Sequence, residues 1–316
     1  MTMANPGLSL VVPVYRNEEN IGDLVAVLDD FYSRYGDNFE AILVVDGSPD
    51  QSWQLLRAEL TARSIPAQLI LLARNFGSFL AIRRGMEAAR HEITAVMAAD
   101  LQEPPELIQD FYEALQEDKA DLAIGVRADR NDGWLRTRLS NLYWGLYRKV
   151  VFPEVPKGGV DVFACNSTVR ETLLSLREHN TSLIGQLFWV GFRRLEVPYF
   201  RRKRTKGSSG WSLRRRFRYM LDSFFAFSDL PIMALLWMGA AGIALSVVAA
   251  ISIFGFWLAG RIDVPGYTPT ILAVLFIGSL LIAGQGIVGA YVWRASENTK
   301  SRPLSVTAHI EVFPRE

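Results

Sequence analysis

Acidic residues stand where three short apolar runs of this chain end or have just ended. Glu18 follows LSLVVPV, Asp46 ends EAILVVD and Asp100 ends EITAVMAAD. Carboxylates suit the hydroxyl groups of a nucleoside, or a hard cation that neutralises a diphosphate. Arg74 and Arg127 follow neighbouring runs, and a guanidinium pairs well with phosphate oxygens. These residue types predict a site for a phosphorylated ligand that is rich in hydroxyl groups.

Parallel β-strands would bring these side chains together. Near-continuous apolar runs that alternate with segments of helical spacing indicate a parallel sheet covered on both faces, which is an α/β fold. In such a sheet, ligands bind where the carboxyl ends of the strands meet the loops. The expected strands are Leu8–Val14, Glu40–Asp46, Ala67–Ala73, Glu92–Asp100 and Ala120–Val126, and the expected helices are 18–35, 51–62, 78–90 and 105–117.

Several common sites for such a sheet are missing from the sequence. No G-x-G-x-x-G follows the first strand and no Walker lysine loop is present, which argues against a dinucleotide-binding or P-loop enzyme. The three histidines have no metal-ligand spacing. Cys165 is the single cysteine, so the chain has no internal disulfide, and a small buried filler is the favoured role for it.

Two uncharged stretches near the C-terminus, Ile232–Gly260 and Tyr267–Trp293, exceed the roughly 20 residues with which a helix crosses a bilayer. They predict a two-helix hairpin in the cytoplasmic (inner) membrane. Basic residues flank its two ends, whereas the connecting loop RIDVPGYTP has one Arg and one Asp, so both termini and the N-terminal domain are expected in the cytoplasm. Frequent Gly and Ala are compatible with helix association into a homo-oligomer.

The basic segment before the hairpin has amphipathic helical spacing. Leu213 and Phe217 fall on one side and Arg214, Arg215 and Arg218 on the other. Such a helix lies in the membrane interface with its cations near the headgroups. Because it runs directly into a membrane span, lipid phosphate is a better partner for these arginines than nucleic acid, and no nucleic-acid partner is expected.

An ordered set of motifs resembles the family-two glycosyltransferases of the GT-A type. Within that family, the set is most similar to the branch that transfers a sugar from a nucleotide sugar to polyprenyl phosphate, and the two-helix hairpin resembles the bactoprenol glucosyltransferase type. The matching stretches are VVPVYRNEENI, VVDGSPDQSW, ARNFGSFLAIRRGMEAA, AADLQEPPEL, GVRADR and RTKGSSGWSLRRRF, and they span nearly the whole chain.

The resemblance implies a role for each matching residue. The nucleotide site would comprise Pro13, Tyr15, Glu18, Asp46, Asp100 and Arg127; Asp100 and Gln102 would hold a divalent metal, Mg or Mn; and Asp161 would be the catalytic aspartate. The acceptor phosphate would meet Arg204, Ser209, Arg214 and Arg215. Since a polyprenyl phosphate is largely a dianion near pH 7, Asp161 would orient the acceptor or the sugar, or remove a residual proton.

Three positions depart from the family pattern. Ala98 replaces the first acid of the D-x-D metal motif, Val45 replaces the acid before the D-G-S turn, and Gly210 stands where a lysine is expected before Trp211. A magnesium-like ion needs only one or two carboxylates beside substrate phosphates and water, so Asp100 suffices for a metal site. Asp100 could instead cap the helix that follows the double proline.

The expected organisation is a GT-A domain (1–210), an amphipathic interfacial helix (211–230), a transmembrane hairpin (231–294) and a cytosolic tail (295–316). The expected reaction moves a glucose-like sugar from a UDP- or GDP-linked donor to undecaprenyl-type phosphate, with inversion and metal assistance. Two alternatives stay open. One is a processive polysaccharide synthase, although QLFWV (186–190) lacks the Q-x-x-R-W motif; the other is a non-catalytic nucleotide-sugar-binding scaffold.

Overall fold

A computed structural model describes residues 6–128, 144–145, 147–149, 151–156, 160, 162–178, 181–202, 226–228, 230–259 and 267–314. The chain forms two compact units. The first comprises Met1–Tyr219 together with Arg302–Glu316, and the second comprises Met220–Ser301. Each unit is considered by itself.

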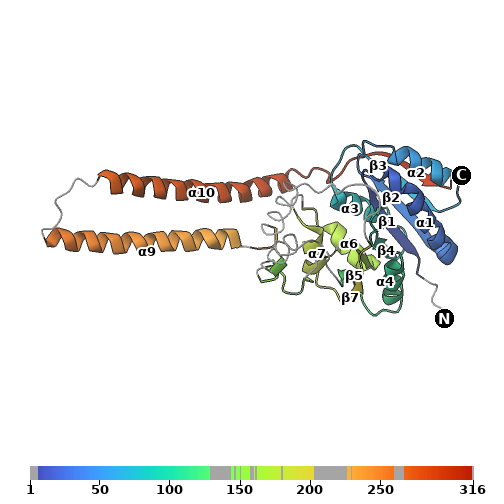
Figure 1. Cartoon of the computed structure of the whole chain (residues 1–316), viewed down its shortest axis with the longest axis horizontal. Helices are drawn as coiled ribbons and strands as arrows, with labels where there is room; N and C mark the ends of the chain where they lie inside the picture. The colour runs from blue at the N-terminus through green and yellow to red at the C-terminus, as the bar shows by residue number, and fades with distance from the viewer. Residues whose placement is uncertain are drawn as a thin grey trace. The chain divides into compact units, whose positions relative to one another are not determined.

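The first unit is built on one eight-stranded sheet with the order β7-β5-β6-β4-β1-β2-β3-β8 (Figure 1). Its parallel centre confirms the predicted α/β fold, and the antiparallel strands are β6 and β8. All five strands expected from the sequence are present. The strands are β1 (Leu8–Val14), β2 (Phe39–Val45), β3 (Ala67–Leu72), β4 (Ile93–Val96), β5 (Leu122–Arg127), β6 (Phe163–Cys165), β7 (Arg194–Tyr199) and β8 (Thr307–Phe313).

Helices cover both faces of this sheet. The side chains that α1 and α4 bury belong to the same core cluster as Leu10 and Leu43 of the central strands. On α3, Gly85 lies so close to β1 that an added Cβ would stand 2.3 Å from Cγ1 of Val11. The helices are η1 (Glu18–Asn20), α1 (Ile21–Tyr35), η2 (Gly36–Asn38), α2 (Ser52–Thr61), α3 (Ser78–Ala88), α4 (Glu106–Gln116), α6 (Ser167–Ser175) and α7 (Leu183–Trp189).

The last residues of the chain return to this sheet as β8. It pairs antiparallel with β3, with Phe313 opposite Ala67, and Phe313 is buried. Arg57 of α2 forms an ion pair with Glu311, and Trp53 packs edge-on against His309. The segment expected as a cytosolic tail therefore contains an edge strand of the first unit.

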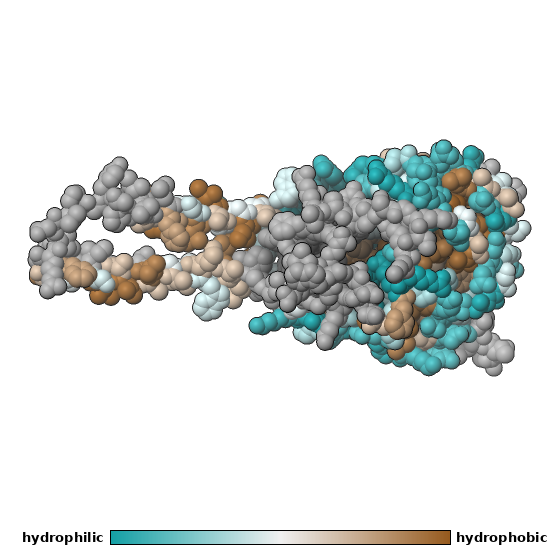
Figure 2. Space-filling model, in the orientation of Figure 1, coloured by the Kyte–Doolittle hydropathy of each residue, from teal (hydrophilic) through white to brown (hydrophobic). Residues whose placement is uncertain are grey.

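The second unit contains two long apolar helices, α9 (Leu230–Leu258) and α10 (Tyr267–Thr299). Within them, Ile232–Ala249 and Phe276–Thr299 are long and apolar enough to cross a membrane. Neither segment is buried among the described residues, and brown and tan, the apolar colours, predominate on the coloured parts of both helices in Figure 2. These helices lie where the sequence predicts the hairpin, and their exposed apolar surface favours association with a membrane.

Candidate active site

Loops that follow the parallel strands share one edge of the sheet, which we call the rim. Because β1 to β4 are parallel, and because β5 and β7 pair with them through antiparallel β6, the carboxyl ends of all six strands meet there. Tyr15, Asp46 and Arg127 stand at or just after the ends of β1, β2 and β5. Asp100 lies four residues beyond the end of β4. The rim thus places these four predicted nucleotide-binding residues at one edge of the sheet.

The loops after β1 and β2 are joined by hydrogen bonds. Glu18 Oε2 accepts the Gln51 N–H at 2.9 Å, and Asp50 Oδ2 accepts the Glu18 N–H at 3.2 Å. The hydroxyls of Ser48 and Ser52 donate to Asp50 at 2.6 and 2.9 Å. Burial raises the pKa of the Asp50 carboxyl, but these hydrogen bonds outweigh it and hold the pKa below its usual value. Asp50 is therefore ionised, and its carboxylate stabilises this turn.

The first rim loop carries the side chains expected beside a base and ribose. Pro13 and Tyr15 are half-buried and Glu18 is exposed. Arg16 has a left-handed backbone (φ 54°), its N–H donates to Ser48 Oγ at 2.8 Å, and its guanidinium lies 5.5 Å from the centre of the Tyr15 ring. A non-glycine residue in this conformation is held there by its surroundings, and such strain gathers at functional loops.

Asp46 is held inside the rim. Asp46 is only 2% exposed, and its two carboxylate oxygens accept the N–H groups of Phe76 and Gly77 at 2.7 and 2.8 Å. Gly47 beside it has φ 54°, and an added Cβ would stand 2.3 Å from the Arg74 carbonyl carbon. The geometry gives Asp46 a positioning role for the loop after β3. Contact with a nucleoside stays a prediction.

Asp100 lies in a tight turn and does not cap a helix. The next helix, α4, begins at Glu106, with Pro105 as its N-cap and no side-chain capping bond. Asp100 is half-buried, and its Oδ1 accepts the Gln102 N–H at 3.3 Å. Between them, Leu101 has the left-handed φ of 51°. The turn therefore holds one carboxylate at the rim.

The chemistry of this turn fits a metal held by few protein ligands. Among the described residues, no group of three or more His, Cys, Asp or Glu side chains could hold a metal ion. One carboxylate is nevertheless enough for an ion that also takes diphosphate oxygens and water. The Gln102 amide is hydrogen-bonded to Arg201 and to the Arg202 carbonyl, at 2.6 and 3.4 Å. It is better placed to fix the turn than to ligate an ion.

Arg127 lies further along the sheet than the other described rim residues. Arg127 ends β5, is half-buried and is opposite Tyr199 of β7. Asp161, Arg204, Ser209, Arg214 and Arg215 lie outside the described residues. Next to Asp161 in sequence, the Val162 carbonyl accepts the Gly125 N–H at 2.9 Å, one residue before β6 begins at Phe163.

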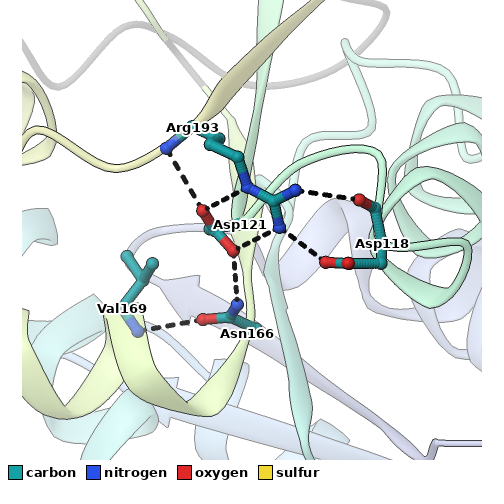
Figure 3. A network of polar contacts seen from close by, with 5 residues as sticks. All are labelled: Asp118, Asp121, Asn166, Val169 and Arg193. Carbon is teal, nitrogen blue, oxygen red and sulfur yellow. Dashed lines mark hydrogen bonds and ion pairs between the residues drawn. The ribbon is translucent and has the colours of Figure 1, made fainter.

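A polar network at the opposite end of the sheet was not foreseen (Figure 3). Arg193 donates to both oxygens of Asp121 at 3.0 Å and also pairs with Asp118. Asn166 donates to Asp121 at 3.2 Å and caps α6 by accepting the Val169 N–H at 3.0 Å. The hydrogen bond from Arg193 lowers the pKa of Asp121. The network joins β5, β6 and β7 away from the rim; its one sequence signal is Asn166, a helix-start residue type.

Comparison with known proteins agrees with the acidic, parallel-stranded rim. The model of the family described as "Glycosyl transferase family 2" matches residues 9–181, more than half of the chain. The chain belongs to this family. It is therefore a glycosyltransferase, and its mixed, mostly parallel sheet is the GT-A fold that the resemblance predicted.

Two relatives are similar along almost the whole chain. A putative glycosyltransferase of Bacillus subtilis (strain 168), CsbB, is 31% identical over 94% of this chain and 89% of its own. The bactoprenol glucosyl transferase of Shigella phage SfX is 30% identical over 94% of this chain and 97% of its own. Among solved structures, the mannosyltransferase PcManGT from Pyrobaculum calidifontis is 15% identical, with a TM-score of 0.48 and coverage of 95% and 89%.

Proposed function

We propose that this glycosyltransferase moves one sugar, glucose in the first instance, from a nucleotide diphosphate donor to a polyprenyl phosphate of the undecaprenyl type. The observation that carries the proposal is the similarity to a bactoprenol glucosyl transferase over 94% of this chain, a span long enough to include apolar helices as well as the rim. The acceptor's tail stays in the bilayer, so the enzyme must work at the membrane surface.

The donor would lie across the rim. Pro13, Tyr15 and Glu18 would line the base and ribose pocket, Asp46 would support it from inside, and Arg127 would pair with the diphosphate. A divalent ion, Mg or Mn, would neutralise charge on the leaving nucleoside diphosphate, and Asp100 would hold it. Gln102 would fix the turn that presents Asp100.

The acceptor oxygen needs little activation. A phosphate monoester with a second pKa near 6 is mostly a dianion at pH 7, so its oxygen is already nucleophilic. It would attack the anomeric carbon as the bond to the diphosphate breaks, which inverts that carbon. Asp161 would orient the reactants or take a residual proton, and Arg204, Ser209, Arg214 and Arg215 would bind the acceptor phosphate.

The membrane arrangement belongs to the same proposal. Both apolar helices would cross the cytoplasmic membrane, with both termini and the first unit on the cytoplasmic side. The basic segment 211–230 would lie in the interface and attract the lipid phosphate. Association of the small-residue helices would give a homo-oligomer.

A donor panel tests the proposal. Full-length protein in lipid nanodiscs containing undecaprenyl phosphate is incubated with radiolabelled UDP-glucose, UDP-galactose or GDP-mannose and MgCl₂ or MnCl₂, and the organic phase is then extracted. Label in a lipid-linked monosaccharide that depends on undecaprenyl phosphate supports the proposal. Label in polymer favours a processive synthase. Donor binding with no label in lipid would leave the chain as a binding scaffold. Asp100→Ala and Asp161→Ala are each expected to abolish most transfer, whereas Asp110→Ala, on the exposed side of α4, is the matched control.

A further inference from the structure

The turn that presents Asp100 is clamped to the segment that follows β7. Arg202 donates its N–H to the Gln102 carbonyl at 2.7 Å, and Arg201 Nη2 donates to the Gln102 side-chain oxygen at 2.6 Å. Gln102 returns a longer hydrogen bond to the Arg202 carbonyl at 3.4 Å. Main chain and side chains thus join two segments that are about 100 positions apart in sequence.

A buried carboxylate strengthens this clamp. The Glu103 side chain is 2% exposed and lies 3.6 Å from the guanidinium of Arg201, whose side chain is 31% exposed. A carboxylate that is removed from water is costly unless a cation stands beside it. Arg201 therefore serves two consecutive residues of the turn, the amide of Gln102 and the carboxylate of Glu103. The neighbouring pair of Arg202 and Glu106 is well exposed, 54% and 68%, and contributes little.

Backbone strain makes the clamp necessary. Leu101 has a left-handed backbone, which is unfavourable for a non-glycine residue and persists only when neighbouring contacts over-determine it. Within the turn, the Asp100–Gln102 hydrogen bond is long, 3.3 Å. The shorter bonds to residues 201 and 202, at 2.6 and 2.7 Å, add to the contacts that hold this conformation.

We infer that Arg201 is a positioning residue that holds the turn presenting Asp100 in its donor-binding form. The inference rests on the proposed function, in which Asp100 serves the diphosphate. Arg201 acts through its contacts with Gln102 and Glu103 rather than through contact with the donor.

A double-mutant cycle on the full-length protein tests this role. Arg201→Ala is expected to lower kcat/KM for UDP-glucose about 10- to 100-fold, the usual loss when a residue that orients a ligand-binding group is removed. Gln102→Ala is expected to cost a similar factor, and the double variant no more than the larger single effect, because both changes break one unit. Arg201→Lys keeps the charge beside Glu103 but cannot match the guanidinium fork, so it recovers part of the loss. Arg57→Ala, which removes the same charge at the β8 edge, is the control.

Independent, multiplying effects of Arg201→Ala and Gln102→Ala would overturn the inference, because Gln102 would then act on its own, for example as a metal ligand. A second measurement does not depend on turnover. Hydrogen exchange of the peptide 97–107 is expected to speed up about tenfold in Arg201→Ala and to stay unchanged in Arg57→Ala, which corresponds to a local opening about 1.4 kcal/mol easier. Unchanged exchange in Arg201→Ala contradicts the clamp. If the wild type transfers no sugar from any donor, the proposed function fails while the exchange experiment still decides the clamp.

Discussion

Asp46 offers the sharpest test of how the rim is built. The sequence motif assigns this acid to the nucleoside, whereas the structure shows its two oxygens accepting the N–H groups of Phe76 and Gly77. Replacement by alanine would remove both acceptors from a residue that is 2% exposed. The loop after β3 would lose its main attachment to β2.

The size of the effect follows from these two hydrogen bonds. A buried donor that loses its acceptor costs about 1–3 kcal/mol, and the partly buried N–H groups of Phe76 and Gly77 fall within this range. Two such donors, less the gain from no longer burying a charge, give about 3 kcal/mol for Asp46→Ala. For a unit of this size, 1 kcal/mol shifts the melting temperature by about 2–4 °C, so a loss of roughly 6–12 °C is expected. Asp46→Asn keeps one acceptor and is expected to lose about half as much.

The assay is thermal unfolding of the full-length protein in detergent without a donor, followed by tryptophan fluorescence. Asp110→Ala is the control, because a surface change of the same residue type stays within about 0.5 kcal/mol. An unchanged melting temperature in Asp46→Ala, combined with a raised KM for the donor, would refute the positioning role and restore the nucleoside contact as the main function of Asp46.

Four further predictions concern parts of the first unit away from the reacting groups. Glu40 is buried and accepts from the Ser9 hydroxyl, the Gln68 amide and the Arg90 N–H at 2.7, 3.0 and 2.7 Å, so Glu40→Ala is expected to cost about 3 kcal/mol in thermal unfolding; a loss under 1 kcal/mol would contradict the network. Burial raises the pKa of the Cys165 thiol to about 12, so DTNB at pH 8 should label it only in the unfolded protein, and fast labelling of the native protein would disprove its burial. The pKa of Asp121 is lowered in the folded state, so the stability that its carboxylate contributes is complete above the unfolded pKa of about 3.9 and is lost as the pH falls through the folded pKa. Asp121→Asn should therefore flatten the dependence of unfolding free energy on pH below about pH 4. A wild-type profile that is already flat in that range would contradict the lowered pKa. Truncation after Ser301 removes β8 and exposes the β3 edge, so light scattering should show aggregation on mild heating, whereas an unchanged onset would mean that β8 does not protect the edge.

Local patterns in the sequence predict most of the first unit. The apolar run at Leu8–Val14 coincides with β1, and the expected helix after the double proline is α4 to within a residue. β4 is shorter than its apolar run, ending at Val96, because the chain turns at 98–103 to present Asp100. These elements can be predicted from one sequence because they depend on local signals, namely the spacing of apolar residues and the positions of prolines.

Residue spacing along the sequence does not predict the contacts between distant segments. β8 pairs with β3 across more than 200 residues, and no local feature of TAHIEVF names its partner. The bonds of Arg201 to Gln102 and Glu103 join the segments that follow β7 and β4, two strands between which β5 and β6 stand in the sheet. Asp50 was not predicted, because the family motif assigns the functional role in this turn to Asp46. In the structure, Asp50 is the acid that accepts hydrogen bonds from the hydroxyls of Ser48 and Ser52 at the start of α2.

Mass spectrometry of the extracted lipid is the most direct test of sugar transfer to a polyprenyl phosphate. Full-length protein, undecaprenyl phosphate, UDP-glucose and MgCl₂ are combined, and the lipid phosphate is measured before and after incubation. We predict the addition of a single hexose to the phosphate, with release of one nucleoside diphosphate for each sugar transferred. Free sugar without a lipid product, a ladder of several sugars, or unmodified lipid with every donor of the panel would contradict it.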